Sequence, residues 1–297
     1  MSTRATSLTA AVVSERPQTY AAIVRAQLLR NRGAVGGLVL LVFAIGVAVG
    51  APWLAPYDPT YQDLLAPLEP PSRKHPFGTD EVGRDILSRV IYGSRISLSV
   101  GLISVSIGGT AGVTLGLVSG FYGGRLDDVI LRVMDLMLAF PGILLALAIV
   151  AVLGPGLFNV MIAVGIAATP SFTRVTRGQT LSVREMDYVV GARAIGCTNA
   201  RVIWRYVLPN VLPSIIVLAT LGLASAILAA SGLSFLGLGA QPPTPEWGAM
   251  LSSGRAYLRQ AWWITTFPGL AIMLTVLGMN MLGDGLRDAL DPKLRRA

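Results

Sequence analysis

Long runs of apolar residues without a single charge restrict the fold of this chain more than any other feature. A bilayer core about 30 Å thick is crossed by about 20 helical residues at 1.5 Å each. Several uncharged runs reach or exceed this length. Only 13% of the residues are charged, whereas about a quarter are charged in a typical soluble domain. The sequence therefore predicts an all-α integral membrane protein.

Six transmembrane helices are predicted from these runs. The run Leu136–Thr173 is too long for one span, and we divide it at Gly154-Pro155-Gly156 because glycine and proline interrupt helices. The helix before this break is expected to begin near Val129. The segment 234–245 is rich in Gly and Pro, so we expect one span, Val211–Ser231, before it. A re-entrant segment covered by protein remains an alternative for 234–245.

The distribution of Lys and Arg predicts the orientation. If both termini are cytoplasmic, 17 of the 24 Lys and Arg residues lie on the cytoplasmic side, as the positive-inside rule requires. The net charge of +8 then indicates cytoplasmic loops beside anionic lipid rather than nucleic-acid binding. The predicted organisation is a cytoplasmic N-terminal segment (1–32), a first transmembrane helix (33–56), an extracytoplasmic loop (57–95), a core with five further transmembrane helices (96–283) and a cytoplasmic tail (284–297). The first span could also be a secretory signal, but the segment before it is too long for a normal n-region.

Residues for catalysis or for tight metal binding are scarce. The two lysines, Lys74 and Lys293, are not part of a glycine-rich phosphate loop. One histidine, His75, and one cysteine, Cys197, cannot form a metal cluster or a Cys/His nucleophile pair. We expect His75 to be a solvated residue of a charged loop and Cys197 to be a small buried thiol. The sequence predicts no catalytic residue, no metal site and no cofactor in this chain.

A few polar residues within the spans are candidates for a transport pathway. Asp135 is an acid near the hydrocarbon, and it could line a path or pair with Arg132 at the interface. Met279 and Asn280 in the last span are further candidates. Glycines also form a stripe in the second span, and helix–helix contact is the favoured interpretation over a substrate-admitting lining. The stripe consists of Gly108, Gly109, Gly112 and Gly116.

The predicted cytoplasmic loop 176–210 contains two short helices. Glu185 and Asp187 favour the N-terminus of the first, and Gly196 can take the left-handed conformation that ends it. Thr198 or Asn199 would cap the second helix, and a proline would end or kink it at the membrane. That proline is Pro209.

The first of these helices has a surface of small residues, which lets another backbone approach closely. From these features alone, an amphipathic loop resting on lipid headgroups is the favoured interpretation. The small residues are Gly191, Ala192, Ala194 and Gly196.

The spacing in this loop resembles the EAA loop of bacterial ATP-binding-cassette importer permeases. Gly191-Ala192, three residues, Gly196, nine residues and then Tyr206-Val207-Leu208-Pro209 follow the pattern of that family. Val190 stands where the family has its glutamate, so Glu185 and Arg193 remain as charged candidates. The resemblance implies a coupling helix that docks into an ATPase subunit, with contact residues Glu185, Tyr188, Gly191, Ala192, Arg193, Ala194, Gly196, Leu208 and Pro209.

Further segments, in order along the chain, resemble the C-type subunit of dipeptide and oligopeptide permeases. They include Asn31-Arg32-Gly33, Ala55-Pro56-Tyr57-Asp58-Pro59, His75-Pro76-Phe77-Gly78-Thr79-Asp80, Gly83-Arg84-Asp85-Ile86-Leu87-Ser88-Arg89, Leu138-Ala139-Phe140-Pro141, Phe235-Leu236-Gly237-Leu238-Gly239, Glu246-Trp247-Gly248 and Gly283-Asp284-Gly285 through Asp291-Pro292. The resemblance implies a type I importer permease fold in a bacterial inner membrane. It also implies a homologous B-type permease, two ATPase subunits that bind ATP and Mg²⁺, an extracytoplasmic peptide-binding protein and a short peptide substrate.

The charged part of the predicted outer loop has helical spacing. A solvated, self-paired helix and a surface that contacts the binding protein and the sister permease are both consistent with it. The candidate contact residues are Phe77, Asp80, Arg84, Asp85 and Arg89.

From the sequence we therefore expect a non-catalytic permease subunit of a peptide importer. Nickel, glutathione and haem are alternative substrates within the same family. A secondary transporter that works alone and a membrane scaffold or receptor are the rival classes.

Overall fold

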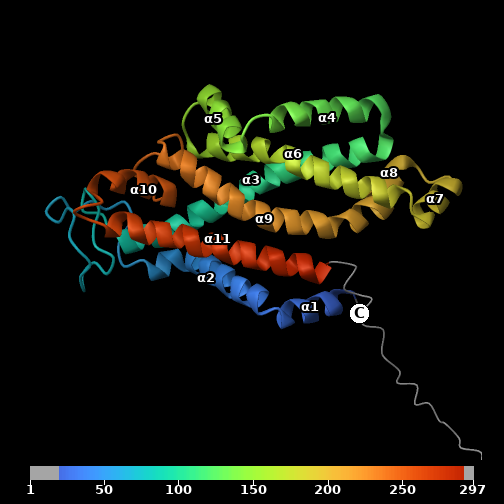
Figure 1. Cartoon of the computed structure of the whole chain (residues 1–297). Coiled ribbons are helices and arrows are strands. Elements are labelled where there is room, and N and C mark those ends of the chain that lie inside the picture. Colours follow the sequence, from blue (N-terminus) through green and yellow to red (C-terminus); the bar gives the residue numbers. More distant parts are fainter. Residues whose placement is uncertain (1–19, 291–297) are drawn as a thin grey trace, which may run out of the picture.

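The computed structural model describes residues 20–290, which form an elongated helical bundle with its long helices side by side (Figure 1). Within this range there is no β-strand beyond one isolated bridge, Thr79 to Asp85. The helices are α1 (Tyr20–Arg30), α2 (Arg32–Leu54), α3 (Ile86–Tyr122), α4 (Gly124–Leu138), α5 (Gly142–Leu153), α6 (Leu157–Arg184), α7 (Asp187–Ala194), α8 (Asn199–Val202), α9 (Leu208–Phe235), α10 (Trp247–Gly254) and α11 (Trp263–Leu290). A π-helical turn (Ile203–Val207) links α8 to α9, and a short 3₁₀ turn (Arg255–Tyr257) follows α10. The outer parts of the predicted end segments, 1–19 and 291–297, lie outside the described residues.

Five helical stretches in the described chain are long and apolar enough to cross a membrane, and the bent pair α4–α5 can make a sixth. The predicted number of spans agrees with this, but the third span is not the single helix that we expected. Its two halves meet at an angle of 92°. Pro141 has no backbone N–H to continue the helix, and it disfavours helical geometry at Phe140. The break therefore occurs at this proline as well as at Gly154-Pro155-Gly156.

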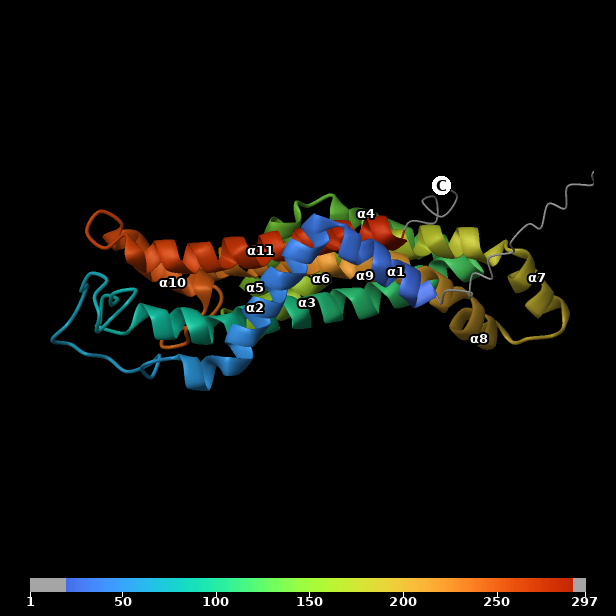
Figure 2. The same cartoon turned by 90° about the horizontal axis from the view of Figure 1, so that it is seen from below.

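The packing of α3 against α6 is the most extensive helix contact in the bundle (Figures 1 and 2). Glycines on α3 allow it, as predicted for the stripe. A Cβ at Gly108 would lie 2.5 Å from the Gly165 carbonyl oxygen, and one at Gly116 would lie 2.6 Å from the Thr176 Cβ. Small residues let two backbones approach closely in the membrane. Gly109 is the exception, because its nearest neighbour there is the Phe172 ring at 3.6 Å.

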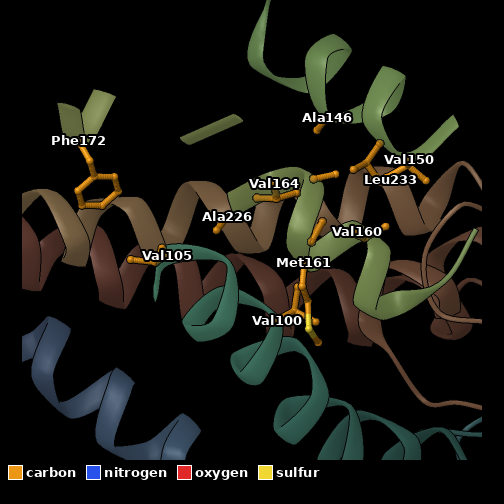
Figure 3. Close-up of a cluster of buried hydrophobic side chains, with 12 residues drawn as sticks. Val100, Val105, Ala146, Val150, Val160, Met161, Val164, Phe172, Ala226 and Leu233 are labelled. Atoms are coloured by element: carbon orange, nitrogen blue, oxygen red, sulfur yellow. The ribbon is translucent and has the colours of Figure 1, made fainter. Parts of the chain in front are cut away.

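The hydrophobic core lies between α3, α5, α6 and α9 (Figure 3). Val100 from α3 and Met161 from α6 meet there, and Val150 from α5 packs near Leu233 from α9. On the other side of the bundle, α2 packs on α11, where Gly37 lies against the Gly278 backbone. The core thus joins α5, the second half of the bent pair, to the long central helices.

The segment after α9 is a loop that is followed by a short helix. Gly237 has a φ of +82° and ends α9, with the Leu238 N–H donating to the Leu233 carbonyl. The short helix α10, which we did not predict, then packs on both α9 and α11. The buried Glu246 caps it by accepting hydrogen bonds from the N–H groups of Gly248 and Ala249 at 3.0 and 2.8 Å.

Candidate functional site

The predicted functional residues lie at opposite ends of the bundle. Helices α7 and α8 project at one end, and the long loop from residue 55 to 85, between α2 and α3, lies at the other (Figure 1). The ends of α1 and α11 are on the side of α7 and α8 (Figures 1 and 2). The two candidate sites are therefore separated by the full length of the long helices.

A left-handed glycine ends α7, as the sequence predicted. Gly196 has a φ of +83°. The Gly196 N–H donates to the Arg193 carbonyl, and the Cys197 N–H donates to the Ala192 carbonyl, at 2.9 and 3.0 Å. These two bonds form a Schellman motif. Thr198, one of the two predicted caps, accepts a hydrogen bond from the Arg201 N–H at the start of α8. The geometry fixes the turn between the two short helices.

The two faces of α7 differ sharply. Val189 and Ala192 are buried in a cluster with side chains of α3 and α9. On the opposite face Val190 is exposed by 51%, whereas the exposed Tyr188 lies at the edge of the buried face, and Ile195 just after the helix is exposed by 80%. Apolar side chains this exposed indicate a surface that a partner protein or the membrane covers.

Burial changes the interpretation of Ala192. We expected Ala192 to contact an ATPase, but it is only 4% exposed and faces the bundle. One turn of α7 cannot present Ala192 and Val190 to the same partner, because they lie on opposite sides of the helix. Gly191 and Ala194 share the exposed side with Val190.

The charged candidates of the loop lie around α7 in different ways. Glu185 caps the C-terminus of α6 and accepts a 2.8 Å hydrogen bond from the Arg184 Nε, so of the two acidic residues predicted at the start of the loop helix Glu185 lies just before it. Asp187 begins the helix. The Arg193 guanidinium lies over the Phe121 ring, 4.5 Å from its centroid. Such a cation–π contact holds Arg193 toward α3.

Pro209 does not end the helical run. It lies in the first turn of α9, immediately after the π-helical turn, and Leu208 donates its N–H to the Ile203 carbonyl five residues earlier. The wider π turn accommodates the missing N–H of a proline. Leu208 is half-buried and Pro209 is exposed.

The candidate charged residues at the end of the long loop and in the first turn of α3 are buried, which contradicts a solvated helix. Asp80, Arg84, Asp85 and Arg89 are each at most 5% exposed. The Asp80 Oδ2 accepts from the Arg84 Nε at 2.5 Å and lies 3.6 Å from the Arg89 Nε. Asp80 to Asp85 is a turn, and α3 begins only at Ile86. These side chains hold the loop together, so they are not exposed to a binding protein in this chain.

His75 is also buried, so the expectation of a solvated histidine is wrong. It is 5% exposed, and its Nδ1 lies 2.9 Å from the Asp85 Oδ1. The same Asp85 caps α3 by accepting from the Ser88 N–H at 2.8 Å. Phe77 stacks on Phe267 of α11, with ring centroids 3.8 Å apart. The loop is therefore joined to both α3 and α11.

The three pathway candidates are placed differently. Met279 is buried between α9 and α11, where it packs with Ala224 and Ile227. Asn280 is exposed. Asp135 is also exposed and pairs with Arg174 of α6, not with Arg132 as considered above. The sequence did not indicate this role of Arg174, although its charge directly follows the uncharged first part of α6.

Together, the spanning helices, the bent pair and the projecting helical loop define the permease subunit of an ATP-binding-cassette importer. The fold is similar to that of a chain in a solved structure of the inward-facing MetNI methionine ABC transporter, with a TM-score of 0.56 and 17% identity over 69% of this chain and 98% of that one. Residues 112–296 match the family of binding-protein-dependent transport system inner membrane components. Residues 19–71 match the N-terminal TM domain of oligopeptide transport permease C. The chain belongs to this family and is a multi-pass inner-membrane permease subunit.

Relatives with assigned names cover almost the whole chain. The di/tripeptide transport system permease protein DppC of Pseudomonas aeruginosa is 50% identical over 275 residues, which are 90% of each chain. The probable D,D-dipeptide transport system permease protein DdpC of Escherichia coli K12 is 49% identical over 87% of each chain. The glutathione transport system permease protein GsiD of Pectobacterium atrosepticum is 47% identical over 91% of this chain and 90% of that one.

Proposed function

We propose that this chain is the C-type permease subunit of an importer for short peptides and that the exposed face of α7 docks into a partner ATPase. The observation that supports the docking is the exposed Val190 on a helix whose opposite face is fixed to the bundle, with Ile195 exposed just after it. The relatives named for di- and tripeptide transport support the peptide substrate.

Docking through α7 is apolar in this chain. Val190 stands at the position of the family's glutamate. Its contact with the ATPase therefore buries the apolar valine side chain, where the family's glutamate could form an ion pair. Fully burying a valine is worth about 1.5–3 kcal/mol. Arg193 is turned toward Phe121, and Glu185 is held by Arg184. The partner groove is therefore expected to be lined by apolar side chains where Val190 and Ile195 enter.

The remaining subunits follow from the same proposal. A homologous B-type permease completes the translocation path, and a second ATPase docks on it. The ATPases bind ATP and Mg²⁺ and carry out all the hydrolysis. A binding protein delivers the peptide at the long-loop end, which is extracytoplasmic, whereas both termini are cytoplasmic. ATP shifts the permease pair between inward- and outward-facing states because it binds one state more tightly.

Cross-linking tests the docking. In a Cys197→Ala chain, Val190→Cys is expected to form a cross-link with the ATPase in the assembled transporter. Phe43→Cys on α2, which is as exposed in the single chain, is the matched control and is expected to form none. If Val190→Cys captures no ATPase in any nucleotide state, α7 is not the docking helix.

Reconstitution tests the transport. The purified complex in liposomes should accumulate a labelled dipeptide only with ATP inside and the binding protein outside. Accumulation by this chain alone under an ion gradient would indicate a secondary transporter. Accumulation of glutathione but of no dipeptide would indicate that the substrate is glutathione, as in the name of the relative GsiD.

A further inference from the structure

An ion pair between two spanning segments is open on the surface of this chain. The Arg174 Nη2 of α6 donates to the Asp135 Oδ1 of α4 at 2.6 Å, and the two side chains are 52% and 59% exposed. Arg174 lies about 26 Å along α6 from its start at Leu157, at 1.5 Å per residue, and therefore toward the cytoplasmic end of a bilayer core about 30 Å thick. Charges within spanning segments rarely face lipid, and they mark water-filled cavities or pathways. The pair itself is therefore not expected to contact acyl chains.

The broken helix leads to the same conclusion independently. One turn after Asp135, α4 ends, and the residues Ala139–Gly142 before and at the start of α5 are exposed. Irregular backbone at membrane depth is tolerated only where protein covers it or where it lines water. The break and the ion pair thus lie together on a surface that must be wet or covered by protein.

A polar stripe on α6 continues from the pair. Ser171, Arg174, Gly178 and Ser182 are exposed at spacings of three and four residues, which place them on one side of the helix. The exposed side of α2 is entirely different, since it carries Val39, Val42, Phe43 and Val49. The α2 side is suited to lipid, whereas the α6 stripe is suited to water.

We propose that the α6 stripe lines the translocation path and that the Asp135–Arg174 pair binds the charged termini of the passing peptide. This inference rests on the proposed function. A short peptide carries an ammonium group and a carboxylate. The Arg174 guanidinium matches a carboxylate in charge and geometry, and Asp135 matches the ammonium.

Exchange of partners keeps such a site from holding its substrate. In the empty path Asp135 neutralises Arg174. When a peptide enters, its carboxylate replaces Asp135 on Arg174 while its ammonium takes Asp135. No charge is left unpaired in either state, so the binding free energy stays small and the peptide can leave.

Cysteine accessibility tests the wetness of the stripe without any substrate. In the assembled transporter with Cys197→Ala, Ser171→Cys and Gly178→Cys should react with a charged, membrane-impermeant thiol reagent, because only water-exposed thiols form the reactive thiolate. Phe43→Cys on α2 should not react. If neither α6 cysteine reacts with or without ATP, the stripe is dry and the inference is wrong.

Peptide uptake tests the contact with the termini. The ratio of free-acid to C-amidated dipeptide uptake should fall by about tenfold in Arg174→Gln, the effect of one charge-assisted hydrogen bond. Both complexes use the same binding protein, so its own preference between the two peptides does not affect the change in this ratio. An ion pair with a structural role alone would lower both rates equally and leave the ratio unchanged, which would contradict the contact. If the wild-type complex transports no dipeptide, the proposed function and the peptide contact both fail, and the labelling alone decides whether the stripe lines water.

Discussion

Replacing Gly112 with alanine should loosen the contact between α3 and α6. The added Cβ would lie 2.4 Å from the Phe172 Cβ and 2.7 Å from the Thr169 carbonyl oxygen, whereas ordinary contacts begin at 3.4 Å. The two helices would have to separate by about 1 Å, and overpacking of this kind costs about 1–3 kcal/mol. Alanine also gains about 1 kcal/mol over glycine in helix propensity, so a control must share that gain.

Gly109→Ala is that control. It lies on the same helix, and its new Cβ would be 3.6 Å from the Phe172 ring. The difference between the two variants therefore isolates the overpacking, and Gly112→Ala should be less stable than Gly109→Ala by about 1–3 kcal/mol. Unfolding of the purified complex by denaturant in detergent measures it. Equal stability of the two variants would show that Gly112 does not limit the approach of α3 to α6.

Three further substitutions test other contacts. Asp127→Asn removes the carboxylate that pairs with Arg177 through two hydrogen bonds of 2.7 Å. The free energy of unfolding should fall by about 1.5–3 kcal/mol in the same assay. An unchanged stability would contradict this prediction. Glu246→Ala removes the cap of α10 and should cost about 1–2 kcal/mol, with faster hydrogen exchange in that helix than elsewhere as the distinguishing measurement. Asp85→Ala leaves His75 and the start of α3 without their acceptor, and we expect faster protease cleavage of the long loop in an otherwise folded complex; cleavage at the wild-type rate would show that the loop does not depend on this carboxylate.

The uncharged runs predicted the number of spans because membrane thickness limits helix length directly. They did not predict the break at Pro141, since it lies inside an apolar run where charge carries no information. The pair Phe140-Pro141 was a visible signal, as the residue before a proline disfavours helical geometry. The extension of α3 outward to Ile86 was also missed, because Arg89 in that segment is buried beside Asp80 rather than solvated.

In the α7 loop, the sequence correctly predicted the features that depend on a single turn of backbone. The left-handed Gly196 and the Thr198 cap follow from backbone geometry within a few residues. The burial of Ala192 and His75 depends on contacts with side chains from other elements. Ala192 packs among side chains of α3 and α9, and His75 meets an aspartate ten residues away. Such contacts leave no periodic trace in the sequence.

The anchoring of α7 by Val189 and Ala192 has a mechanical consequence. Their cluster includes Leu117 of α3, Val183 of α6 and Val211 of α9. A push on the exposed side of α7 is therefore delivered to three long helices at once, and the short helix cannot yield by itself. A displacement of α7 is therefore transmitted along these helices to the opposite end of the bundle.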